Sequence, residues 1–319
     1  MKAFLTLLKS EHLEHRGGQL WTPVILGGLI IILLIAGMLH EGSMIISLAS
    51  DNSEVTIRTV EDAHRVLRDE IGEEKIGPVL QGLAFASSYF GIAILMIVAA
   101  VVSYFQMVGS MHNERADRSV LFWKSMPVSD IEVTLAKFVS ATFGTILLAG
   151  VIGVAVSAIG IIVHSISGPL GSTPEWGVII HPSVIASTLT LGFSLAVFYV
   201  LWAAPVYAWI LLASAWAPRS PLLYVAVPPV AIGILELLTT REGSWLWREI
   251  GSRVSGSMLR YDGTVGNAHH TAGSLSRALM QPVSEMVVQA AASPRFWLGL
   301  VLAALFIWGA SEIRRRRIA

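Results

Sequence analysis

Few side chains of this sequence are grouped in the patterns that catalysis or metal binding requires. The 319 residues include no cysteine, which excludes disulfides, thiolate metal ligands and a cysteine nucleophile. His12 and His15 resemble half of a metal site, but no HExxH motif is present and their neighbours are charged, so we interpret both as part of a solvated helix face. We therefore predict a protein that is not itself an enzyme, with no catalytic residues and no metal ligands.

Charged and aromatic side chains are instead concentrated in one segment, residues 112–130, between two long apolar stretches. The segment begins with charged residues, continues with Val, Leu, Phe and Trp, and breaks at a proline. Asn113 can cap a short helix in which Glu114 and Arg118 are four residues apart, the spacing of an ion pair on one helix face. Such a rigid helix could pass force from a soluble partner to the membrane. An ordinary charged loop is the alternative that these residues leave open.

A second helix is predicted to follow this segment directly. Ser129 is placed to cap it, Glu132 stands at the reciprocal position of a capping box, and Asp130 favours the positive end of the helix dipole. The chain is thus expected to form a helix, a sharp turn and a long helix that enters the membrane past Lys137.

The elements that must hold this segment are membrane-spanning helices. Hydrophobic residues make up 54% of the chain and charged residues only 14%, against about 25% in an ordinary soluble domain. A spanning helix needs about 20 mostly apolar residues. The stretches that qualify are 20–39, 79–108, 131–164, 183–213, 221–238 and 296–313. We predict an all-α integral membrane protein with six transmembrane helices in a single domain.

The charge distribution predicts how these helices are oriented. Arg314 to Arg317 directly follow the last span and mark its end as cytoplasmic, and an even number of spans puts both termini on that side. The loop 165–182 has no Lys or Arg, as an outer loop should. We expect a multi-pass protein of the bacterial cytoplasmic (inner) membrane. Because the net charge is zero, no nucleic-acid partner is predicted, and the lipid bilayer is the main environment.

Three segments outside the spans have features of their own. Residues 1–16 place apolar side chains at helical spacing, which predicts a helix in the inner membrane interface, with a cytoplasmic helix packed on protein as the alternative. The outer loop 41–78 is acidic and predicts a short amphipathic helix from Thr59. The outer loop 239–294 combines Trp with Arg, which suits a membrane surface, and part of it is expected to dip back into the bilayer.

Two spans carry patterned side chains. The third has small residues at every fourth position, which predicts a seam where another helix packs closely: Ala141, Thr145, Ala149, Gly153 and Ser157. The fourth has an aromatic stripe and a proline, Pro205, that should kink it. Three of its aromatic residues are candidates for lining a substrate path: Tyr199, Trp202 and Trp209.

The charged segment resembles the signature of permeases of the type-two ATP-binding cassette (ABC) exporters. The residues that carry the resemblance are Glu114-Arg115, the run LFWKSMPVSD at 121–130, and Ala136-Lys137. The overall layout is similar too, although the acidic loop 41–78 departs from it. The resemblance implies that the helix around 114–123 is a coupling helix seated in a cleft of an ATPase subunit. Its coupling residues would be Glu114, Arg115, Asp117, Arg118, Phe122 and Trp123.

This resemblance implies the membrane-spanning subunit of an ATP-driven exporter. Since the chain lacks a GxxxxGK[ST] phosphate loop, it holds no cofactor itself, and a separate nucleotide-binding ATPase subunit would bind ATP and Mg. A second permease chain, identical or homologous, would complete the complex. No ionisable residue stands at the middle of a span, which favours a hydrophobic or amphipathic substrate such as a drug, peptide or lipid. The alternatives are a non-transporting scaffold or sensor with the same ATPase contact, and a membrane-embedded enzyme.

Overall fold

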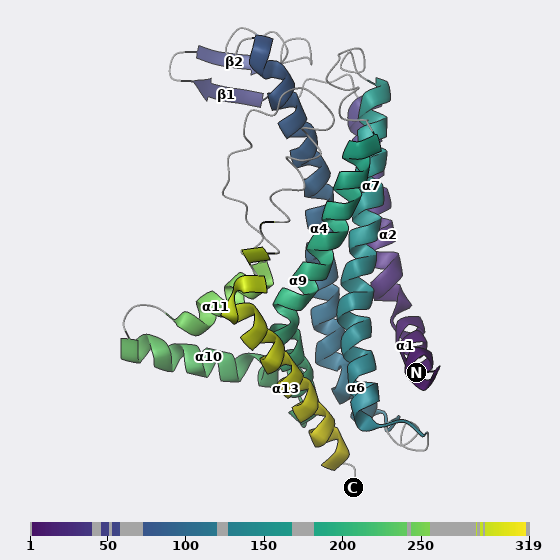
Figure 1. Ribbon diagram of the computed structural model, residues 1–319, viewed down its shortest axis with the longest axis vertical. Coiled ribbons are helices and arrows are strands. Elements are labelled where there is room, and N and C mark those ends of the chain that lie inside the picture. The colour runs from purple at the N-terminus through teal and green to yellow at the C-terminus, as the bar shows by residue number, and fades with distance from the viewer. Residues whose placement is uncertain are drawn as a thin grey trace.

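Long helices form an elongated bundle, and a side arm of two helices leaves it (Figure 1). The computed structural model describes residues 2–39, 46–50, 53–57, 73–119, 127–167, 182–240, 244–255, 285, 288–289 and 291–316. Both chain termini lie at the same end of the bundle, which we call the terminal end (Figure 1). The elements in chain order are α1 (Lys2–Glu14), the π-helical turn η1 (Gly17–Trp21), α2 (Thr22–Leu39), β1 (Ile46–Ser50), β2 (Ser53–Ile57), α4 (Glu73–Ala116), α6 (Asp130–Val139), the π-helical turn η2 (Ser140–Gly144), α7 (Thr145–Ser167), α9 (Pro182–Trp216), α10 (Pro221–Thr240), α11 (Trp245–Ser255) and α13 (Pro294–Arg316).

Within the described residues, six helical stretches are long and apolar enough to cross a membrane. They are Gly17–Ala36, Gly91–Ala116, Asp130–Gly160, Gly192–Trp216, Pro221–Thr240 and Pro294–Arg316. Each overlaps one predicted span, so the prediction of a helical multi-pass membrane protein is confirmed. The largest shift is in the second span, which was expected at 79–108. There α4 is one helix of 44 residues, and at about 1.5 Å per residue it is longer than the bilayer core of about 30 Å.

The all-α prediction missed a short β-hairpin in the loop after α2. Strands β1 and β2 pair antiparallel, with Ile46 opposite Ile57 and Leu48 opposite Val55. Asp and Asn separate the two strands in the sequence, and both residue types are common in tight turns. The amphipathic helix predicted from Thr59 lies outside the described residues, as does most of the loop 165–182. A helix is present within 1–16, and its position in the membrane interface stays a prediction.

The predicted small-residue seam of the third span is confirmed. Ala141, Ala149 and Thr145 are buried, at 1% exposure or less. The backbone of Gly153 lies so close to α4 that a Cβ there would be 3.2 Å from Ile92 Cα. Because side chains this small let backbones approach, α4 and the helix from α6 to α7 pack along their length. Helix α9 packs against both and also against α13, and these helices contribute most of the main core.

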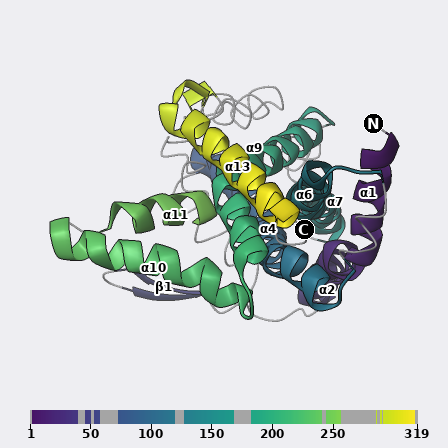
Figure 2. The same ribbon diagram turned by 90° about the horizontal axis from the view of Figure 1, so that it is seen from below.

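Helices α10 and α11 form an arm that projects from the side of the bundle (Figures 1 and 2). Glu236 of α10 accepts hydrogen bonds from Ser244 Oγ (2.6 Å) and from the backbone N–H of Leu246 (3.1 Å), so α10 supplies an acceptor to the first turn of α11. Trp247 of α11 packs directly on Gly233, where a Cβ would clash with the indole ring. Within the predicted Trp- and Arg-rich outer loop, α11 is therefore a helix fixed to the preceding span.

Arg253 attaches α11 to the bundle. Its guanidinium group lies 2.8 Å from Glu249 Oε1 and donates hydrogen bonds of 3.0 Å to the backbone oxygens of Trp202 and Arg295. It also stands 4.8 Å from the ring centroid of Trp202, a cation–π distance. A Cβ on Gly299 of α13 would clash with this group. One buried arginine thus joins α9, α11 and α13.

The substitution Gly299→Ala should displace Arg253 and lower the free energy of unfolding by about 1–3 kcal/mol, because overpacking also breaks the hydrogen bonds of a buried charge. The matched control is Gly28→Ala, since a Cβ there meets nothing within 4 Å. The midpoint of thermal unfolding in detergent, followed by tryptophan fluorescence, should fall for the first variant and be equal or higher for the second. Equal midpoints for both variants would show that Arg253 does not hold the arm.

Candidate functional site

The charged segment after α4 differs in part from its prediction. Helix α4 continues through Ala116, and the N–H of Asp117 still donates to the carbonyl of Asn113 (3.0 Å). Asn113 is therefore inside the last turn of α4, and the prediction that it caps a separate short helix is wrong. The chain leaves the helix at Arg118, whose φ of 62° is left-handed, as is common one or two residues beyond a helix end. Residues 120–126 lie outside the described residues, and with them Phe122 and Trp123.

The carboxyl end of the charged segment has the predicted structure. Helix α6 begins at Asp130, and Ser129 caps it. The N–H of Ser129 donates to Glu132 Oε2 (2.9 Å), and the N–H of Glu132 donates to Ser129 Oγ (3.3 Å), so both bonds of the capping box are present. This cap fixes the direction in which the chain enters the third span.

Charged side chains from four helices form a buried ion cluster at the terminal end. Its members are Glu11 of α1, Glu114 of α4, Asp130 and Lys137 of α6, and Arg314 of α13. Lys137 Nζ lies 2.7 Å from Glu11 Oε1 and 2.9 Å from Glu114 Oε1. Arg314 Nη1 lies 2.7 Å from Glu114 Oε2, and its Nε lies 3.1 Å from Asp130 Oδ1. Figure 2 views the bundle from this end, where α4, α6 and α13 come close together.

Charge balance makes both cations of the ion cluster necessary. The side chains of Lys137 and Arg314 are each only 3% exposed. Three carboxylates face these two cations, but Asp130 is 24% exposed and lies in the first turn of α6, where the helix dipole favours an anion. The remaining four charges balance. Loss of either cation would leave two buried carboxylates with one cation, and an uncompensated buried charge costs about 3–5 kcal/mol.

A network of buried polar contacts adjoins the ion cluster and joins α1, η1, α4 and η2. Gln19 of η1 is fully buried, and its amide nitrogen donates to Gln106 Oε1 of α4 (3.1 Å) and to Ser140 Oγ of η2 (3.0 Å). His12 Nδ1 stands 2.6 Å from Gln19 Oε1. The two π-helical turns of the described chain thus meet at one glutamine. Single π-helical turns within helices are frequent at functional sites.

Arg115 binds the end of α9, and its contact with an ATPase subunit stays a prediction. Its Nη2 donates to the carbonyls of Ser214 (2.6 Å) and Ala217 (2.9 Å), at the carboxyl end of α9. These carbonyls lack helical N–H partners, and a cation there also complements the helix dipole. The hydroxyl of Ser214 in turn donates to the carbonyl of Val108 (2.8 Å), so α4 and α9 are joined at this end.

The aromatic residues suggested for a substrate path lie at packing contacts. Tyr199 OH donates to the carbonyl of Val254 (3.1 Å), and Trp202 Nε1 donates to that of Ser252 (3.0 Å), both in α11. Trp209 Nε1 donates to the carbonyl of Val225 in α10 (3.2 Å). Hydrogen bonds from all three side chains therefore attach the arm to α9. A contact of these residues with substrate stays a prediction.

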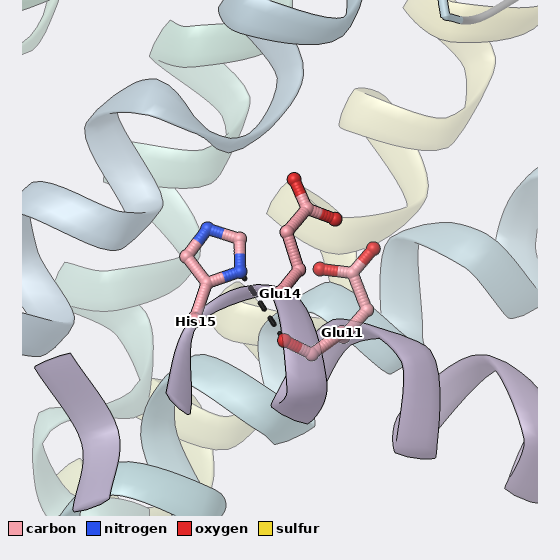
Figure 3. A group of neighbouring side chains, drawn as sticks. All are labelled: Glu11, Glu14 and His15. Atoms are coloured by element: carbon pink, nitrogen blue, oxygen red, sulfur yellow. Dashed lines mark hydrogen bonds between the residues drawn. The ribbon is translucent and has the colours of Figure 1, made fainter. Parts of the chain in front are cut away.

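A group of possible metal ligands lies on α1, where Glu11, Glu14 and His15 come together (Figure 3). Their ligand atoms lie within 4.8 Å of one another. However, Glu11 Oε1 is paired with Lys137, and His15 Nδ1 faces the backbone oxygen of Glu11 at 3.2 Å. Glu14 and His15 alone supply fewer ligands than the three or four of a typical zinc site. We therefore assign Glu11 to the ion cluster.

The sequence indicated Glu114 as a candidate functional residue, but it did not indicate the buried residues that pair with it. Glu11 had no local signal, and Arg314 was interpreted only as a marker of membrane orientation. Comparisons with protein-family models, with curated proteins and with solved structures found no match to this chain. The site is therefore interpreted from its own geometry.

The variant Arg314→Gln should be strongly destabilised, because Glu11 and Glu114 are then left with Lys137 as their cation and Asp130 loses its ion pair with Arg314. We expect a loss of about 3–5 kcal/mol in the free energy of unfolding. The matched control is Arg316→Gln on the same helix, whose arginine is 77% exposed and pairs with Glu312 at 2.6 Å. That surface pair should contribute at most about 1 kcal/mol. Similar unfolding midpoints for the two variants would contradict the importance of the buried cluster.

Proposed function

We propose that this chain is the membrane-spanning subunit of an ATP-driven exporter of the type-two ABC class. The proposal rests on the resemblance of residues 114–137 to the permease signature, together with the six candidate spans. The observation that carries it is the anchoring of the charged segment at both ends. Glu114 and Asp130 lie near the two ends of the segment, Lys137 lies just after it, and all three belong to the buried ion cluster.

A segment that transmits force from a partner to the membrane helices needs ends that are fixed in this way. If the ends of the segment were not fixed to the bundle, a force on the segment would move the segment alone. Here each end is tied by ion pairs to α4, α6 and α13, so displacement of the segment shifts whole helices. Packed helices move as units because protein interiors are dense and hardly compressible.

Of the proposed coupling residues, those with exposed side chains are proposed to contact the ATPase. Glu114 is 7% exposed, and Arg115 caps α9, so both anchor the segment from inside. Asp117 and Arg118 are exposed and form the described part of the contact surface. The N–H of Ser119 lowers the pKa of the Asp117 carboxyl below its usual value, so Asp117 is negatively charged at neutral pH.

The transported compound is proposed to be hydrophobic or amphipathic. Within the described residues, the buried charged side chains are those of Glu11, Glu114, Lys137, Arg253 and Arg314. Four of them belong to the ion cluster at the terminal end, and Arg253 attaches α11. Ion-coupled carriers need ionisable groups along the path through the membrane. A nucleotide-binding subunit would bind ATP and Mg, and a second permease chain would complete the path.

The variant Arg118→Glu tests the ATPase contact. It should sharply reduce recovery of a nucleotide-binding protein with this chain from native membranes, and reduce ATP-dependent export of a fluorescent amphipathic dye from proteoliposomes. The unfolding midpoint should not change, because Arg118 is exposed. The matched control is Arg219→Glu, an exposed arginine between α9 and α10.

Wild-type recovery of a nucleotide-binding protein is the first requirement of this experiment. If none is recovered even after cross-linking in the membrane, the exporter proposal fails. If a partner is recovered and hydrolyses ATP while neither dye nor lipid moves, the scaffold or sensor alternative is favoured instead.

A further inference from the structure

The hydroxyl group of Ser214 in α9 binds directly to the backbone of α4. Ser214 is fully buried. Its hydroxyl donates to the carbonyl of Val108 (2.8 Å) and accepts from the N–H groups of Met111 and His112 (both 3.2 Å). A serine hydroxyl has one donor and two acceptor sites, so all of them are used here. Alanine and cysteine, which are similar in size, lack these strong hydrogen-bonding sites.

The groups that Ser214 binds belong to the hydrogen-bond ladder of α4. In an α-helix each N–H donates to the carbonyl four residues earlier. For His112 that carbonyl is the one of Val108, so the hydroxyl of Ser214 binds both partners of one helical hydrogen bond. A side chain inserted into this ladder is one of the causes of helix bending. The direction of α4 beyond His112 therefore depends on the position of Ser214.

Helix α4 in turn binds the end of α9. Arg115 Nη2 donates to the carbonyls of Ser214 (2.6 Å) and Ala217 (2.9 Å). His112 Nδ1 lies 3.4 Å from the carbonyl oxygen of Ala217. Each helix thus supplies polar side chains to the backbone of the other. We call the contact formed by Ser214, Arg115 and His112 the reciprocal clamp.

The reciprocal clamp is next to the proposed ATPase contact. Asp117 and Arg118 are exposed, and both lie within one helical turn of Arg115. The N–H of Asp117 still donates to the carbonyl of Asn113, so this end of α4 is held by helical hydrogen bonds. A change in the direction of α4 at the clamp therefore changes where both exposed side chains are presented.

On its other side the reciprocal clamp is connected to the arm. Ala217, whose carbonyl the clamp binds, directly follows α9, and α10 begins four residues further along the chain. Trp209 Nε1 donates to the carbonyl of Val225, which holds the start of α10 on α9. The rings of Trp216 and Tyr224 also meet edge-on, with their centroids 5.6 Å apart. The start of α10 is therefore fixed to the end of α9.

The next step rests on the exporter proposal. We propose that Ser214 is a positioning residue that sets the direction of the last turn of α4 and thereby couples the ATPase contact to the arm. When the partner moves Asp117 and Arg118, the reciprocal clamp moves the end of α9, and α10 follows. Without the hydroxyl of Ser214, the ladder of α4 closes on itself, and the ends of α4 and α9 move independently.

The positioning step can be measured on the full chain alone, because the protein has no cysteine of its own. Spin labels at Ala116→Cys and Leu223→Cys, both exposed positions, report the distance between the end of α4 and the start of α10 in nanodiscs. Excess unlabelled protein restricts the measurement to distances within one chain. The intact clamp should give one narrow peak. Adding Ser214→Ala should raise the fraction of molecules outside this peak about fivefold, since a typical hydrogen bond is lost.

The matched control is Ser110→Ala in α4. Ser110 is also buried, but its hydroxyl donates to the carbonyl of Met107 in its own helix (3.0 Å). This control should keep the narrow peak. Arg115→Lys keeps the charge but loses the planar group that reaches two carbonyls, so it should broaden the peak and decides the question if Ser214→Ala does not fold. An unchanged distribution with a folded Ser214→Ala overturns the positioning role, whatever the protein transports.

The coupling step is tested with the ATPase partner in proteoliposomes. Ser214→Ala should keep ATP hydrolysis and lower the amount of dye exported per ATP about fivefold, whereas Ser110→Ala should leave this ratio unchanged. Loss of folded protein would lower hydrolysis and export together, so the ratio separates positioning from stability. An unchanged ratio with Ser214→Ala overturns the coupling step and leaves the exporter proposal standing. If the wild type exports nothing, the exporter proposal and the coupling step fail, and the distance measurement still decides the positioning role.

Discussion

Glu114 is shared between two cations, and most of the terminal end depends on this sharing. One carboxylate oxygen pairs with Lys137 and the other with Arg314, so a single acid joins α4 to α6 and α13. Through Lys137 the same cluster reaches α1. A buried ion pair adds little net stability compared with apolar packing, but each member becomes indispensable once its partner is present. The cluster therefore specifies one arrangement of these four helices at the terminal end.

Two arginines donate hydrogen bonds to backbone carbonyls of α9. Arg115 donates to carbonyls at the carboxyl end of the helix, and Arg253 donates to the carbonyl of Trp202 further along it. The first joins α9 to the charged segment, and the second joins it to the arm. Because α9 also packs on α4, α7 and α13, movement at the terminal end can reach the arm through one helix. This connection gives the proposed transporter a route from its terminal end to the arm.

Local and periodic features of the fold could be predicted from the sequence, and long-range pairings could not. Apolar runs predicted all six spans, and the spacing of Ser129 and Glu132 predicted the start of α6. By contrast, Lys137 and Glu11 are 126 residues apart, and Arg314 and Glu114 are 200 apart. No helical period relates such positions. The change from apolar to charged residues near Asn113 looked like a helix start, but the α4 hydrogen bonds continue to Asp117.

The claim that these charges act as one buried unit is tested most directly by a double-mutant cycle on Glu114 and Arg314. The variants Glu114→Gln, Arg314→Gln and their combination would be unfolded in detergent, with the pair of Glu312 and the exposed Arg316 as the reference cycle. We predict a coupling energy of about 2 kcal/mol or more for the buried pair, and less than about 0.5 kcal/mol for the reference pair. Equal, small coupling energies for both pairs would contradict it.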